Sequence, residues 1–113
     1  MIVDDLIAAL STFGIPVYRQ GALSEMSYPD SFFTFWLTES YDHSHYDNNT
    51  YLYSYQFDVN LYSTDPDYIY QTMSDARDTL KNNGFIVSGK GSDIESDSVD
   101  HVGLTFRVYA LED

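Results

Sequence analysis

The sequence predicts an α+β domain in which two helices pack on one face of a mostly antiparallel sheet. Two segments repeat their apolar residues at helical spacing, and the long strand-like segments alternate apolar and polar residues. Each strand thus has one apolar face and each helix one apolar stripe, which a two-layer arrangement buries together. The predicted order is α-β-β-β-α-β-β. With 113 residues and no linker, repeat or low-complexity break, residues 1–113 are expected to form a single domain.

The first helix is predicted over residues 3–13. Its apolar residues form a single stripe: Ile2, Leu6, Leu10 and Phe13. Gly14 is expected to end it, because glycine suits the position after a helix. Ile15–Arg19 follows as a short strand, and Pro16 places it at a sheet edge or a strand start. Gln20–Asp30 is a predicted polar loop.

The second strand is predicted over Ser31–Thr38. Phe32 and Trp36 lie on the face opposite Phe33 and Phe35, and they make that face less polar than usual. Two explanations stay open: a partner covers this face, or the two side chains pack under a loop. The polar segment Glu39–Asn49 is predicted as the loop of a long-armed hairpin.

The third strand is predicted over Thr50–Ser63. Its odd positions, from Tyr51 to Leu61, are apolar or aromatic, and most of its even positions are polar. Strands usually have about 5–6 residues. The length of this one therefore indicates a central strand of a curved sheet, or a strand that projects beyond the domain.

The second helix is predicted to begin at Thr64-Asp65-Pro66, where Asp65 can cap the first turn and Pro66 needs no N–H partner. Asn83-Gly84 ends it, and its buried stripe is Ile69, Met73, Ala76 and Leu80. Phe85–Ser88 and His101–Leu111 are the last two strands. Gly89–Asp100 is a predicted acidic connection between them, in which Asp93, Glu95 and Asp97 would face one way if extended.

Charge is the most informative feature of the composition. Eighteen acidic residues against five basic ones give a net charge of −13. The five Lys and Arg are scattered along the chain, so stable binding of nucleic acid is not expected. The eleven tyrosines fit either strands or interfaces.

The chain is also expected to be unexported and not to enter a membrane. The chain has no cysteine, which fits a reducing compartment. Asp4 and Asp5 stand where a signal peptide needs positive charge. The early uncharged run Leu6–Tyr18 is too short to span a bilayer.

No motif predicts an enzyme. His43 and His45, flanked by carboxylates, could ligate a divalent metal, but a solvated or interfacial loop is the favoured interpretation. Gly89-Lys90-Gly91-Ser92 lacks the spacing and the following helix of a phosphate loop. No GxSxG motif is present. Neither a cofactor nor a catalytic residue is therefore predicted.

Several stretches in order resemble the small tail-completion or tail-terminator proteins (tail-to-head joining proteins) of long-tailed phages and Gram-positive prophages. They span nearly the whole chain and consist of strand and cap residues rather than catalytic signatures. The stretches are residues 14–18 (GIPVY), 28–35 (YPDSFFTF), 40–42 (SYD), 46–48 (YDN), 55–60 (YQFDVN), 62–66 (YSTDP), 80–85 (LKNNGF) and 87–89 (VSG).

The resemblance implies a structural virion protein that is not an enzyme. Such proteins form a ring, typically a hexamer, at the head-proximal end of the tail tube, join it to the head–tail connector and let DNA pass. The isolated chain could be monomeric, with rings forming only on the tube, and it would reside in the host cytoplasm during assembly. Expected interface residues are Phe32, Trp36, Tyr41, His43, His45, Tyr46, Tyr51 and Tyr53. Expected acids of the ring lumen, which would keep DNA from sticking, are Asp58, Asp93, Glu95 and Asp97.

Two other functions remain open. The first is an acidic protein-binding module, such as an inhibitor that mimics DNA, whose binding to a basic partner would be sensitive to salt. The second is a metal-dependent enzyme that uses His43 and His45, which would retain stoichiometric metal after purification.

Overall fold

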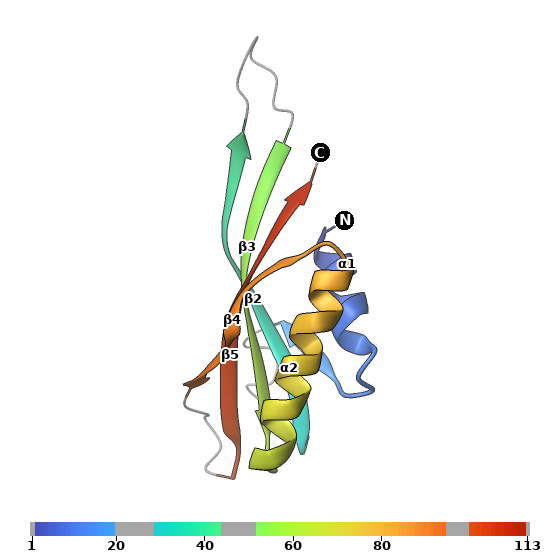
Figure 1. The fold of residues 1–113 in the computed structure, drawn as a ribbon, viewed down its shortest axis with the longest axis vertical. Coiled ribbons are helices and arrows are strands. Elements are labelled where there is room, and N and C mark those ends of the chain that lie inside the picture. The colour runs from blue at the N-terminus through green and yellow to red at the C-terminus, as the bar shows by residue number, and fades with distance from the viewer. Residues whose placement is uncertain (1, 20–28, 44–51, 95–99, 113) are drawn as a thin grey trace.

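A five-stranded sheet with both helices on one of its faces makes up the described part of the chain (Figure 1). The structure is a computed structural model, and it describes residues 2–19, 29–43, 52–94 and 100–112. The α+β class and the order α-β-β-β-α-β-β are confirmed. The elements are α1 (Ile2–Ser11), β1 (Val17–Arg19), β2 (Ser31–His43), β3 (Leu52–Ser63), α2 (Pro66–Asn82), β4 (Ile86–Ile94) and β5 (Val102–Glu112).

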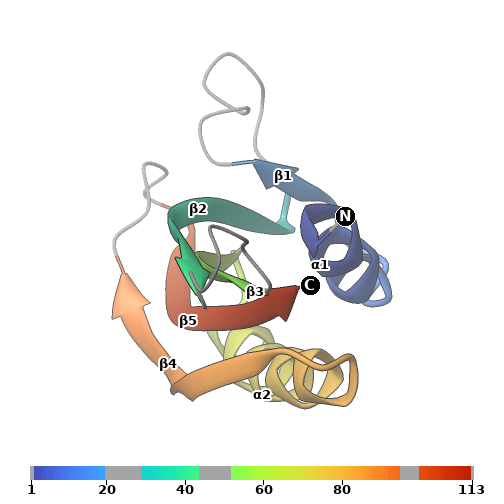
Figure 2. The same cartoon turned by 90° about the horizontal axis from the view of Figure 1, so that it is seen from above.

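The strands lie in the order β1-β2-β3-β5-β4. β1 runs parallel to β2, and every other neighbouring pair is antiparallel, so the sheet is mostly antiparallel as predicted. Viewed along the long axis, the sheet is strongly curved, and α1 and α2 lie together on one side of it (Figure 2). β3 is the central strand, which agrees with its length and its regular alternation.

The hydrophobic core lies between the helices and the sheet. The odd positions Phe57, Val59 and Leu61 of β3 are fully buried. They meet the apolar stripes of the helices, which are buried as predicted at Leu6, Leu10, Ile69, Met73, Ala76 and Leu80. The burial pattern therefore follows directly from the two periodicities in the sequence.

Both ends of α2 have the predicted chemistry. The backbone N–H of Asp67 donates to Asp65 Oδ1 over 3.0 Å, so Asp65 caps the helix, and Pro66 occupies the first turn. At the other end Gly84 has φ +90°, a backbone conformation that residues with a side chain rarely adopt. The N–H of Phe85 donates a hydrogen bond to the carbonyl oxygen of Leu80 over 3.0 Å, which closes the last turn.

β2 is longer than predicted. The sequence indicated a loop from Glu39, but β2 pairs with β3 as far as His43 opposite Leu52, so the prediction was wrong over residues 39–43. A bulge at Thr38 explains the error: Leu37 pairs with Phe57 and Glu39 with Gln56. The bulge changes which residues of β2 face the helices. Pairing with β3 keeps the polar segment after the bulge in an extended conformation. Residues 44–51, including the predicted strand residues Thr50 and Tyr51, lie outside the described residues.

β4 is also longer than predicted, because it continues through the segment that was expected to begin a loop. The register with β5 breaks between Ser88 and Ser92 and then resumes to Ile94. Gly89 and Gly91 in this bulge have φ values of +73° and +114°, which only glycine adopts without strain. The prediction of a connection starting at Gly89 was therefore wrong. Its remaining part, residues 95–99, lies outside the described residues.

The molecule is elongated. Its radius of gyration is 15.1 Å, whereas a compact domain of this length would have about 13 Å, and its extents are 53 × 29 × 22 Å. The ends of β2 and β3 near residues 43 and 52 extend beyond the helices and the other strands (Figure 1). No helix in the described ranges is long and apolar enough to cross a membrane.

Candidate functional site

The sheet face opposite the helices, called here the open face, is the candidate functional surface. Side chains of residues that pair across neighbouring strands point to the same face, so the registers define its members. They include Phe32, Thr34, Trp36, Glu39, Ser54, Gln56, Asp58, Asn60, Tyr62, Ile86, Ser88, Ser92, Ile94, Gly103, Thr105, Arg107, Tyr109 and Leu111. The register also places Tyr18 of β1 beside Thr34.

An aromatic cluster occupies one end of the open face. Phe32 stacks on Tyr62 with ring centroids 5.2 Å apart, and Tyr18 and His101 approach it edge-on at 6.3 and 5.7 Å. His101 Nε2 lies 2.7 Å from the carbonyl oxygen of Pro29, to which it hydrogen-bonds. Phe32 is only 3% exposed, so in the single chain it belongs to this cluster and not to the accessible surface.

Polar pairs run along the middle of the open face. Asn60 Nδ2 donates to Thr34 Oγ1 over 3.1 Å, and both residues are buried. At the bulge, Thr38 Oγ1 donates to the carbonyl of Gln56 over 3.0 Å and accepts from Gln56 Nε2 over 2.9 Å. These hydrogen bonds compensate for polar groups that have left water. They therefore link β2 to β3 on the side that the helices do not cover.

An ion pair joins β3 to β5 on the open face. Arg107 Nε donates to Asp58 Oδ1 over 3.3 Å, and both side chains are at least one-third exposed. The hydrogen bond that Arg107 donates to Asp58 and the attraction of the Asp58 charge raise the pKa of Arg107 above its usual value. Arg107 therefore stays charged at any physiological pH, and Asp58 is compensated rather than a free negative charge.

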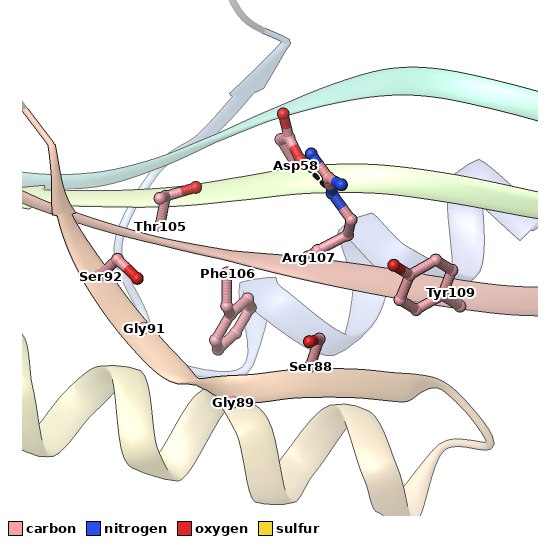
Figure 3. Close-up of a pocket in the computed structure, with 9 residues that line it drawn as sticks. All are labelled: Asp58, Ser88, Gly89, Gly91, Ser92, Thr105, Phe106, Arg107 and Tyr109. Atoms are coloured by element: carbon pink, nitrogen blue, oxygen red, sulfur yellow. Dashed lines mark hydrogen bonds and ion pairs between the residues drawn. The ribbon is translucent and has the colours of Figure 1, made fainter.

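A shallow polar hollow of about 470 Å³ lies beside this ion pair, where the bulge separates β4 from β5 (Figure 3). Its walls combine hydroxyl side chains, the ion pair, glycine backbone and one core ring: Asp58, Ser88, Gly89, Gly91, Ser92, Thr105, Phe106, Arg107 and Tyr109. None of these is a histidine or cysteine that could serve as base or nucleophile at neutral pH. The hollow can hold water or a polar group.

Two large apolar side chains are exposed on β2 at the level where β1 ends. Trp36 on the open face is 47% exposed, and Leu37 on the helix-side face is 42% exposed. β1 pairs with β2 only from Phe33 to Phe35, so both side chains lie just past the last covered residue of β2. Exposed apolar groups on both faces of one strand are typical of a contact surface.

The other predicted interface residues are only partly described. Tyr53 is 36% exposed and pairs with Asp42. Tyr41 and His43 lie in β2 opposite Ser54 and Leu52, as the backbone register shows. His45, Tyr46 and Tyr51 lie outside the described residues. In the described part of the chain, no group of three or more His, Cys, Asp or Glu could hold a metal ion.

The two described acids of the predicted lumen set do not share a face. Asp58 lies on the open face, whereas Asp93 pairs with Leu104 and lies on the helix side. Tyr70 Oη of α2 donates to Asp93 Oδ1 over 3.3 Å. Glu95 and Asp97 lie outside the described residues.

Sequence reasoning missed three features of this surface. The Asp58–Arg107 pair needed the β3–β5 register, which one sequence does not provide. The hollow depends on the bulge, for which Gly89 and Gly91 two residues apart were an available signal. The exposure of Leu37 accompanies the short length of β1, whose pairing with β2 ends at Phe35, so in the described part of the chain only β3 pairs with Leu37.

Comparison with known proteins adds no assignment. A scan against protein-family models finds no match, and a search of the curated proteins finds none either.

Proposed function

We propose that the chain is a structural virion protein, a tail terminator that forms a ring at the head-proximal end of a phage tail tube. In this function it joins the tube to the head–tail connector and lets DNA pass. The proposal rests on the sequence stretches that resemble such proteins, and the α+β fold in the order α-β-β-β-α-β-β is consistent with it.

The projecting end of the sheet is the structural observation that most supports this function. A ring that caps a tube needs contacts to its neighbours and further contacts along the tube axis. Here β2 and β3 extend past the helices (Figure 1), and Trp36, Leu37 and Tyr53 are exposed on them. Heterologous contacts between identical subunits close into a ring when the rotation from one subunit to the next divides a full turn into a whole number of steps.

The net charge of −13 supports the passage of DNA through such a ring. Acidic surface repels phosphate, so DNA would slide without being held. Asp58 adds little to this repulsion, because Arg107 compensates its carboxylate. The repulsion therefore comes from the other acidic residues of the chain.

Native mass spectrometry of the chain, alone and mixed with the tail-tube protein encoded near it, tests the proposal. We expect rings of a fixed copy number, typically six, at least in the presence of the tube protein. Trp36→Ala should weaken ring formation, whereas Tyr70→Ala, which changes an exposed aromatic residue on α2, should not. A persistent monomer without affinity for tube or connector proteins would contradict the proposal.

An acidic module that binds a basic protein, as a DNA mimic does, is the second candidate, and the charge of −13 favours it. A mimic presents its negative charges in a regular array on one surface. Among the described acids, Asp58 and Asp93 lie on opposite faces of the sheet, and Asp75 lies on α2. Tight, salt-sensitive inhibition of a DNA-binding protein by the isolated chain would favour the mimic over the tail protein.

A further inference from the structure

The outer half of β2 has one open edge. On its inner edge β2 pairs with β3 up to His43. On its outer edge β2 pairs with β1 only at Phe33–Phe35, and no strand among the described residues pairs with this outer edge from residue 36 to residue 43. We call residues 36–43 the free edge. Such an edge presents unused N–H and C=O groups to which another strand can bind.

The register identifies the backbone groups that point outward. The N–H of Phe33 donates to the carbonyl of Pro16, so the odd positions before the bulge face the outer edge. N–H and C=O groups alternate sides along a strand. Leu37 therefore faces outward. After the bulge Glu39 pairs with Gln56, which shifts the alternation by one, so Ser40 and Asp42 face outward.

Apolar side chains flank the start of the free edge on both faces of the sheet. Trp36 lies on the open face and Leu37 on the helix side, and they are 47% and 42% exposed. Tyr53, 36% exposed, lies on the same face as Leu37. An added strand places alternate side chains over the two faces, so it would find apolar contacts on each of them.

Charge indicates what kind of strand binds here. The free edge contains Glu39 and Asp42, and the whole of β2 contains no Lys or Arg. Pairing of this edge with the same edge of a second copy would bring its acids against the identical acids of that copy, which is unfavourable. The complementary occupant is an extended segment rich in Lys and Arg that belongs to a different protein.

We propose that the free edge of β2 binds an extended, basic segment of another protein by strand addition. Backbone hydrogen bonds to Leu37, Ser40 and Asp42 would hold the segment, its apolar side chains would contact Trp36 and Leu37, and a cation would face Glu39. The proposal goes beyond ring formation, and it holds whether or not the isolated chain forms rings.

Fluorescence anisotropy with labelled octapeptides tests the proposal. The probe repeats two Val residues followed by two Lys or Arg residues, so that each face of the added strand carries both apolar and cationic side chains. One control peptide has Glu in place of every Lys and Arg, and a second is the basic peptide N-methylated at alternate residues. We expect the basic peptide to bind and to weaken as salt is added, and the acidic peptide not to bind. N-methylation, which removes about two backbone hydrogen bonds, should weaken binding about tenfold or more.

Ser40 provides the matched pair of protein variants. Ser40→Pro removes an outward N–H that β3 does not use, so the β2–β3 pairing can persist, whereas Ser40→Ala keeps the N–H. We expect Ser40→Ala to bind normally and Ser40→Pro to bind about tenfold more weakly. If Ser40→Pro does not fold, Glu39→Lys, a change at an exposed position, should lower the affinity for the basic peptide.

Three results would overturn the proposal. Equal binding of the basic and acidic peptides would remove the charge argument. Equal binding of the N-methylated peptide, or of Ser40→Pro and Ser40→Ala, would exclude strand addition. Self-association of the chain that Ser40→Pro abolishes would assign the edge to a second copy. Ring formation is measured without peptide, so a failure here is distinguishable from a failure of the proposed function.

Discussion

Gly103 sits at a point of the open face where even one added methyl group lacks room. The residue pairs with Tyr62 of β3 and Ile94 of β4. A Cβ at this position would lie 2.9 Å from Ile94 Cγ1 and 2.9 Å from Tyr62 Cε1. The Tyr62 ring cannot move away freely, because it stacks on the buried Phe32 at 5.2 Å. Gly103→Ala should therefore destabilise the fold through steric overlap.

The expected loss combines two terms. Overpacking a filled site costs about 1–3 kcal/mol, and alanine returns roughly 0.4–1 kcal/mol by restricting the unfolded chain. The net loss in the free energy of unfolding then lies between about 0 and 2.6 kcal/mol, with a central value of about 1.3 kcal/mol. With an unfolding entropy of about 2.1 cal/mol/K per residue, each kcal/mol lowers the Tm of a chain of this length by roughly 4 °C. With the central value, Gly103→Ala should lower the Tm by about 5 °C.

Thermal unfolding followed by circular dichroism measures this change, and Ile94→Ala provides the matched background. Truncating Ile94 removes Cγ1, so Gly103→Ala should cost less in the Ile94→Ala protein than in the unmodified one. A Gly103→Ala protein as stable as the parent, or a cost that is the same in both backgrounds, would refute the packing and the β3–β5–β4 register on which it depends.

Three further predictions concern the core, the α2 cap and the ion pair. Phe57→Ala should lower stability by about 3–5 kcal/mol, because the ring is fully buried; a loss below about 1 kcal/mol in urea titration would contradict the assigned core. Asp65→Ala should cost about 1 kcal/mol and Asp65→Asn much less, since only Asn keeps an acceptor for the N–H of Asp67; equal Tm values would exclude the cap. Arg107→Leu should change the Tm only slightly, and by the same amount at every pH between 5 and 9, because the pair with Asp58 is exposed. Because the pKa of Arg107 is raised in the folded protein, the contribution of its charge to stability is complete below the pKa of the unfolded chain and is lost only in strong alkali. An effect of Arg107→Leu on the Tm that changes between pH 5 and pH 9 would contradict this ion pair.

Local chemistry in the sequence was sufficient to predict the fold. The alternation from Tyr53 to Leu61 predicted the central strand and its buried face, and the cap at Asp65 predicted where α2 begins. These signals act within a few residues, so one sequence carries them. The bulges at Thr38 and at Gly89–Gly91 were not predicted, because each depends on the register with a strand that is distant in sequence.

The candidate surface could be predicted only in part. Trp36 stood out by its residue type and is exposed, but Phe32, selected by the same reasoning, is covered by Tyr18, Tyr62 and His101. Which aromatic residue is covered depends on tertiary packing. The free edge could not be predicted either, because it depends on where β1 stops pairing with β2.

Immunogold electron microscopy of phage particles released by cells that carry the gene tests the proposed tail-terminator function most directly. Tail-terminator function predicts label at the junction between the tail tube and the head connector, and particles that lack the gene should have unjoined heads and tails. Label elsewhere on the particle or no label on it, together with normal joining in the gene's absence, would contradict the account.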